Sequence, residues 1–110
     1  MTHATRRDVR NNWRTSEEHE LGNGLVLTIT THKVSSGSIV TSASVLKREG
    51  GFMVHAMYQD FSKRLGIAQF RATPKAMGEH HDACIKDAGG LDSLIKEAKC
   101  HHRAELAVAA

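Results

Sequence analysis

Aromatic residues are scarce in this chain, where Phe, Trp and Tyr together make up 5% of the residues. Proteins that bind single-stranded nucleic acid commonly stack bases on exposed aromatic rings, so the scarcity argues against stacking as the main contact. Cysteine is also rare, because only Cys84 and Cys100 occur. Two cysteines are too few for a disulfide framework and are compatible with a reducing compartment. We therefore expect a cytoplasmic protein without structural disulfides.

Long hydrophobic runs are absent as well, since none approaches the roughly 20 residues that a membrane-spanning helix requires. Residues 1–14 are polar and arginine-rich and lack the apolar core of a secretory signal peptide, so export by that route is not expected. The spacings Gly-x-Gly-x-x-Gly and Gly-x-Ser-x-Gly do not occur either. The sequence therefore predicts neither a dinucleotide cofactor nor a serine-hydrolase nucleophile, and we expect no other cofactor.

The composition that remains is that of a soluble globular protein, with 40% hydrophobic and 25% charged residues. A chain of 110 residues is the size of one ordinary domain, and no linker or internal repeat divides it. We predict a single domain over 1–110, in which 1–12 form a flexible basic arm.

Four runs of alternating or β-branched residues, separated by glycine-bearing turns, predict a four-stranded antiparallel meander. The strongest turn signal is Asn23-Gly24, because both residue types tolerate the positive φ of a type I′ turn. Ser35-Ser36-Gly37 and Gly50-Gly51 mark the other two turns. The predicted strands are 13–21, 24–33, 38–47 and 51–59.

Two helices are predicted after the strands. Thr73-Pro74 is a typical helix start, since threonine caps free amide groups and proline at the first helical position loses no hydrogen bond. The first helix covers 74–88 and ends at Gly89-Gly90, and the second covers 91–106. Between the sheet and these helices, residues 60–71 form a connector that fits a short helix followed by an extended piece. The fold class is therefore α+β, with both helices packed on one sheet face.

Basic residues form the first candidate site. Arginines crowd the N-terminus, and further cations recur at strand ends and in the connector. Such residues neutralise phosphates and position nucleic acid without reading its sequence, although they equally suit a solvated surface. The predicted nucleic-acid-binding residues are Arg6, Arg7, Arg10, Arg14, Lys47, Arg48, Lys63, Arg64 and Arg71.

Histidines and cysteines form a second cluster, made of His80, His81, Cys84, Cys100, His101 and His102. Thiolates and imidazoles are preferred zinc ligands, and four of them could converge from two adjacent helices. The spacing, however, matches no specific zinc template. We favour the alternative that His81 and Cys84 pack in the core while His80 and His101 are solvated, and we predict no metal site.

A third group, on the predicted half-polar sheet face, combines His19, His32 and His55 with Glu17, Thr28 and Thr30. An imidazole within reach of a carboxylate could act as a general base, but a catalytic site normally also needs a concave apolar pocket. A hydroxyl-rich solvent face is the interpretation we favour, and we predict no catalytic residue.

Three functional hypotheses follow. The first is a small non-enzymatic binding module that contacts nucleic acid through the basic arm and loops. The second is a protein–protein interaction factor, an inhibitor or adaptor, that acts through the sheet edge or the helices. The third is a small enzyme that uses a sheet-face histidine. Because a meander leaves edge strands exposed, we also expect a homodimer, with Trp13 as a natural contact.

Overall fold

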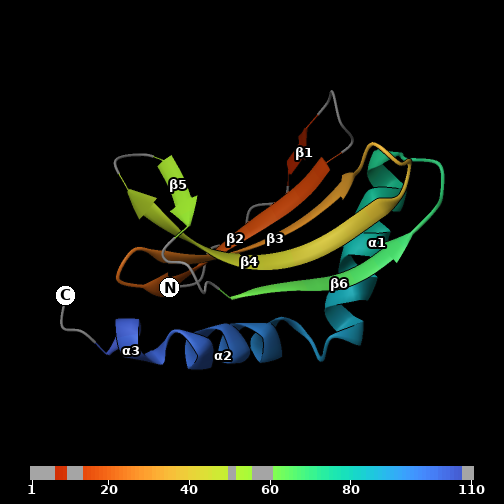
Figure 1. Cartoon of the computed structure of the whole chain (residues 1–110). Helices are drawn as coiled ribbons and strands as arrows, with labels where there is room; N and C mark the ends of the chain where they lie inside the picture. Colours follow the sequence, from red (N-terminus) through yellow and green to blue (C-terminus); the bar gives the residue numbers. More distant parts are fainter. Residues whose placement is uncertain (1–6, 10–13, 50–51, 56–60, 108–110) are drawn as a thin grey trace.

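A computed structural model describes residues 7–9, 14–49, 52–55 and 61–107 (Figure 1). Its strands are β1 (Arg7–Val9), β2 (Arg14–Gly22), β3 (Leu25–Lys33), β4 (Ile39–Glu49), β5 (Phe52–His55) and β6 (Ser62–Ala68). Its helices are α1 (Pro74–Asp87), α2 (Leu91–His101) and α3 (Arg103–Leu106). Trp13 and residues 56–59 of the last predicted strand lie outside the described residues.

The described strands form one antiparallel sheet in which β1, β2, β3 and β4 are neighbours in chain order. The second edge of β4 is divided, because β5 pairs with residues 46–49 and β6 pairs with residues 39–44. Strands β2 to β5 correspond to the four predicted strands, and the helices follow them in the chain and contact the sheet. The predicted α+β meander is confirmed.

The turn between β2 and β3 consists of Asn23 and Gly24, whose φ angles are 51° and 79°. Positive φ at both central residues is what a two-residue type I′ turn requires, so the prediction from this dipeptide is confirmed. Immediately before the turn, Gly22 has a φ of 123°, and the pairing with β3 shifts by one residue between Glu20 and Gly22. This β-bulge determines which side chains of β2 face the helices.

Two strands were not predicted. Strand β1 lies within the residues expected to form a flexible arm, and it pairs with β2 from Arg7 opposite Ser16 to Val9 opposite Arg14. Strand β6 occupies the connector for which a short helix was considered. The prediction of a short helix is wrong for residues 62–68, because these residues form a strand that pairs with the N-terminal part of β4.

Helix α1 begins as its sequence predicts. The Thr73 hydroxyl accepts a hydrogen bond from the backbone N–H of Ala76 at 3.1 Å, and Pro74 occupies the first helical position. After the helix, Gly89 and Gly90 have φ angles of 101° and 98°, and the Gly90 N–H donates to the carbonyl of Ile85 at 2.9 Å. The two glycines thus end α1 by adopting a conformation that other residues rarely adopt.

All three helices lie on one side of the sheet (Figure 1). Core side chains from the sheet, including Leu27, Ile29 and Val45, meet Leu94 and Ala98 of α2 in one buried cluster. Helix α1 adds Met77, His81 and Cys84 on its buried face. None of the helices in the described ranges is long and apolar enough to cross a membrane.

The predicted second helix, 91–106, is divided at His102 into α2 and α3. His102 is fully buried, and its Nε2 accepts a hydrogen bond from the Phe61 N–H at 3.0 Å. Its Nδ1 donates to the carboxylate of Glu105 at 2.7 Å. The side chain of His102 therefore joins the residue before β6 to the last helical turn, at the position where the two helices meet.

Candidate functional site

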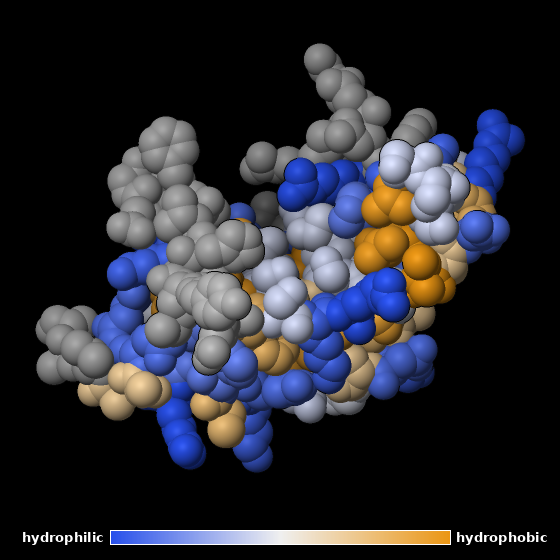
Figure 2. All heavy atoms as spheres, in the orientation of Figure 1, coloured by the Kyte–Doolittle hydropathy of each residue, from blue (hydrophilic) through white to orange (hydrophobic). Residues whose placement is uncertain are grey.

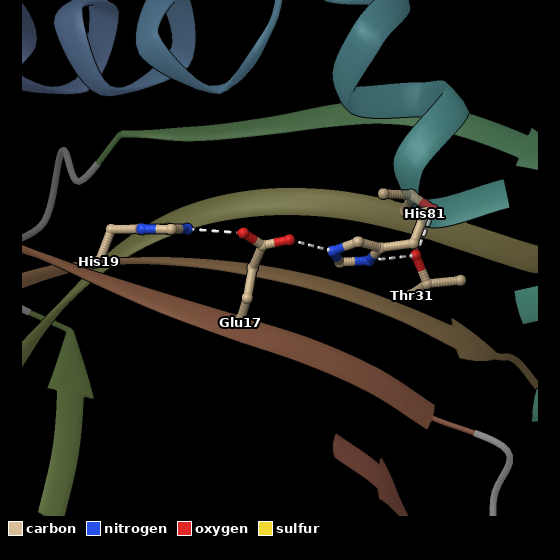
Figure 3. A network of polar contacts seen from close by, with 5 residues as sticks. Glu17, His19, Thr31 and His81 are labelled. Atoms are coloured by element: carbon tan, nitrogen blue, oxygen red, sulfur yellow. Dashed lines mark hydrogen bonds and ion pairs between the residues drawn. The ribbon is translucent and has the colours of Figure 1, made fainter. Parts of the chain in front are cut away.

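Buried polar side chains join the sheet to α1 (Figure 3). The Glu17 carboxylate accepts hydrogen bonds from Nε2 of His19 and Nε2 of His81, both at 2.6 Å. Nδ1 of His81 contacts Oγ1 of Thr31 at 2.8 Å, and that oxygen contacts Oγ1 of Thr41 at 2.6 Å. We call these five residues the buried polar network.

The charge of this network is centred on Glu17. Burial by itself would raise the pKa of Glu17, but the hydrogen bonds from His81 and His19, together with their electrostatic attraction, lower it from 4.5 to about 2. The carboxylate is therefore ionised at neutral pH. Because all five side chains are buried, the network attaches α1 to the sheet and is closed to a ligand in solution.

The register of the sheet corrects the predicted histidine group. Glu17 pairs with Ile29 and His19 pairs with Leu27, so both lie on the face that the helices cover. His32 lies on the opposite face, and the side chain of His55 is outside the described part. Glu17 and His19 therefore share one face, but their expected grouping with His32, Thr28 and Thr30 is wrong. The bulge near Gly22 is the physical reason, because a shift of one residue exchanges the two faces of a strand.

The predicted histidine and cysteine cluster is dispersed. His81 and Cys84 are buried in the core, as expected, while Cys100 and His101 are exposed and His102 is buried beside Phe61. Within the described ranges, no three His, Cys, Asp or Glu side chains are arranged to hold a metal ion.

The thiol of Cys84 contacts His80, which lies one turn earlier on α1. Its Sγ lies 3.5 Å from Nε2 of His80. Burial raises the pKa of the Cys84 thiol, and burial lowers the pKa of His80. A thiol whose pKa is raised is a weaker nucleophile at neutral pH.

Opposite the helices, the sheet presents an open face whose centre consists of hydroxyl groups. The register places Ser16, Thr30, Ser42 and Arg64 in one row across β2, β3, β4 and β6. The next row contains Glu18, Thr28, Ser44 and Ser62. Figure 2 shows such pale, weakly polar residues over the middle of the sheet, with hydrophobic residues to one side. We call the row from Ser16 to Arg64 the hydroxyl row.

The predicted basic residues in the described part of the chain lie on β1, β2, β4 and β6 and after β6. Arg14, Arg48, Lys63, Arg64 and Arg71 are exposed, and Lys47 is half-buried. Arg48 is paired with Glu18, and Lys63 on β6 is paired with Glu97 of α2, each at 3.2 Å. Arg7 belongs to β1, but its side chain is not described, and Arg6 and Arg10 lie outside the described residues.

A hollow of about 300 Å³ opens beside the hydroxyl row, lined by Arg14, Thr30, His32 and Lys33. In the described part of the chain, no carboxylate pairs with either Arg14 or Lys33, in contrast to Arg48 and Lys63. Nδ1 of His32 is buried and has no hydrogen-bond partner among the described residues. Two cationic residues without a carboxylate partner among the described residues thus line one concave position together with Thr30 and His32, and we call it the cationic hollow.

Comparison with protein-family models found no match to this chain, and comparisons with curated proteins and with solved structures likewise found none.

Sequence reasoning did not single out Thr31 or Thr41, and it left Lys33 out of the predicted nucleic-acid-binding residues. For Lys33 a signal existed, because it follows His32 at the end of a strand whose neighbour begins with Arg14. For the two threonines the only signal was their position on the apolar alternation of β3 and β4, where a hydroxyl needs a buried partner.

Proposed function

We propose that this protein is a small binding module that contacts nucleic acid through the open face of its sheet and the basic residues at its borders. The observation that carries the proposal is the cationic hollow, where Arg14 and Lys33 have no described carboxylate partner. A cation that is already paired gains little from a phosphate, whereas an unpaired cation releases the counterions of the nucleic acid when it binds.

The arrangement of the open face favours contact with the backbone of a nucleic acid. The hydroxyl row begins next to the hollow and ends at Arg64, so a strand that crosses the sheet meets cations at both ends. Serine and threonine hydroxyls donate to phosphate and sugar oxygens but carry little sequence information. We expect binding that depends strongly on salt and weakly on sequence.

The test is the salt dependence of binding to single-stranded DNA and RNA, measured by fluorescence anisotropy with the wild-type protein and a variant carrying Arg14→Ala and Lys33→Ala. For single strands, each lost phosphate contact reduces the slope of log K against log salt by about 0.7, so two lost contacts reduce it by about 1.4. The matched control carries Lys96→Ala and Lys99→Ala, which removes the same charge from exposed positions of α2.

The control should bind with nearly the wild-type slope, because its substitutions lie on the helical side of the molecule. Absence of binding by the wild-type protein at low salt contradicts the proposed function. Equal losses in both variants would mean that net charge, rather than the cationic hollow, attracts the nucleic acid.

A specific observation supports the second function, a protein–protein interaction factor. Ile67 on β6 is 55% exposed, and in the described part of the sheet β6 pairs only with β4. An edge strand with an exposed apolar residue can receive a strand of another protein or of a second copy of this chain. The mass of the protein in solution, with and without Ile67→Lys, tests the second-copy case and the predicted homodimer. A monomeric wild type would contradict the homodimer.

A further inference from the structure

We propose that the cationic hollow receives the terminal phosphate monoester of a nucleic acid strand. The inference rests on the proposed function and deepens it, since it assigns one chemical group of the ligand to one position on the protein.

The concentration of charge is the first argument. Arg14 and Lys33, which carry permanent positive charges, both line one hollow of about 300 Å³. A phosphate monoester carries a charge between −1.5 and −2 at neutral pH, whereas a phosphodiester within a strand carries −1. Two cationic residues that line one concave position therefore match the charge of a monoester better than that of a diester.

The number and origin of the donors form the second argument. Arg14, Thr30, His32 and Lys33 line the hollow, and a monoester offers three strongly accepting terminal oxygens. Thr30 and His32 are two residues apart on β3 and therefore share the open face. Arg14 begins the neighbouring strand, so the residues that line the hollow come from two paired strands.

The open face of the sheet indicates the path of the rest of the bound strand. Thr30 lines the hollow and also belongs to the hydroxyl row, which continues over Ser42 to Arg64. With about 4.8 Å between neighbouring strands, the row from β2 to β6 spans about 14 Å. A strand whose end is held in the hollow would thus extend over this row, with Arg64 positioned for an internal phosphate.

The experiment compares short single-stranded oligonucleotides of one sequence that carry a 5′-phosphate, a 3′-phosphate or no terminal phosphate. One phosphorylated form is expected to bind about tenfold more tightly than the unphosphorylated form, since it adds charge-assisted hydrogen bonds. The form that is preferred identifies the end of the strand that enters the hollow. Arg14→Ala should abolish the preference, and Arg14→Lys should restore part of it.

Arg64→Ala serves as the matched variant, because it removes one cation from the same face but not from the hollow. It should weaken binding of all three oligonucleotides by a similar factor and leave the preference intact. Circular dichroism verifies that each variant is folded. Equal affinity of the wild type for all three oligonucleotides overturns this inference while the proposed function stands, and absence of binding to all three overturns both.

Discussion

Replacing Glu17 by glutamine keeps the shape of the side chain but removes the negative charge at the centre of the buried polar network. The amide of Glu17→Gln can accept one of the two imidazole hydrogen bonds, while its NH₂ group faces the other imidazole as a donor. His19 and His81 would therefore lose the shared carboxylate that each now contacts at 2.6 Å. We expect a large loss of stability for a change of so few atoms.

The magnitude follows from the pKa of Glu17, which falls from 4.5 to about 2. At about 1.4 kcal/mol for each tenfold change in proton affinity, this corresponds to roughly 3 kcal/mol of stability at neutral pH. The side chain is only 6% exposed, so solvent screens the interaction little. Because the pKa is lowered on folding, the contribution is fully present above pH 4.5 and is lost as the pH falls from 4.5 towards 2.

Urea unfolding followed by circular dichroism at pH 7, 5 and 2.5 measures this contribution. At pH 7 and 5, Glu17→Gln should be less stable than the wild type by about 3 kcal/mol, and the difference should shrink at pH 2.5. The control is Glu18→Gln, the next residue on the opposite face. Glu18 is 44% exposed and is paired with Arg48 at 3.2 Å, so its replacement should cost less than about 1 kcal/mol.

Two results would refute this reasoning. One is a loss in Glu17→Gln that is no larger than the loss in Glu18→Gln at pH 7. The other is a difference between the wild type and Glu17→Gln that stays constant from pH 5 to pH 2.5, since the stabilisation would then not come from the ionised carboxylate.

Two further substitutions test the attachment and the start of α1. Gly66→Ala would place a methyl group 2.6 Å from Sγ of Cys84, so we expect urea unfolding to show a loss of about 1–3 kcal/mol. Adding Cys84→Ala should recover part of that loss. A Gly66→Ala variant as stable as the wild type would mean that α1 can move away from β6 without loss of stability. Thr73→Ala removes the cap that accepts from the Ala76 N–H and should cost about 1 kcal/mol in the same assay. Thr73→Ser keeps the hydroxyl as its control, and equal losses in the two variants would show that the hydroxyl is not what stabilises the helix.

Features that depend on neighbouring residues could be predicted from the sequence. The turn at Asn23-Gly24 and the helix start at Thr73-Pro74 follow from backbone preferences that act within a few residues. Strand β6 could not be predicted in this way, because its extended form depends on pairing with the distant strand β4. Alternation is weak in residues 62–68, so the tertiary partner rather than the local pattern determines the conformation.

The buried polar network could not be predicted, because it depends on a β-bulge that neither the alternation of residues nor the turn sequence reveals. An unshifted pairing continued from the Asn23-Gly24 turn would place Glu18 opposite Ile29 and thus on the covered face. The observed bulge places Glu17 there instead. Adjacent glutamates give no indication of which one is buried, since either requires a partner. That partner, His81, is supplied by α1, far along the chain.

The divided edge of β4 has a consequence for the order of folding. Leu46 pairs with His55 in a local hairpin, whereas Ile39 pairs with Ala68, a residue much farther along the chain. Contacts between distant residues form at a higher entropic cost, so β6 and α1 are expected to join a sheet that has already begun to form. Interactions made after the transition state affect mainly the unfolding rate. Stopped-flow kinetics of Glu17→Gln should therefore show faster unfolding with nearly unchanged folding, which would make the buried polar network a determinant of how long the native state persists.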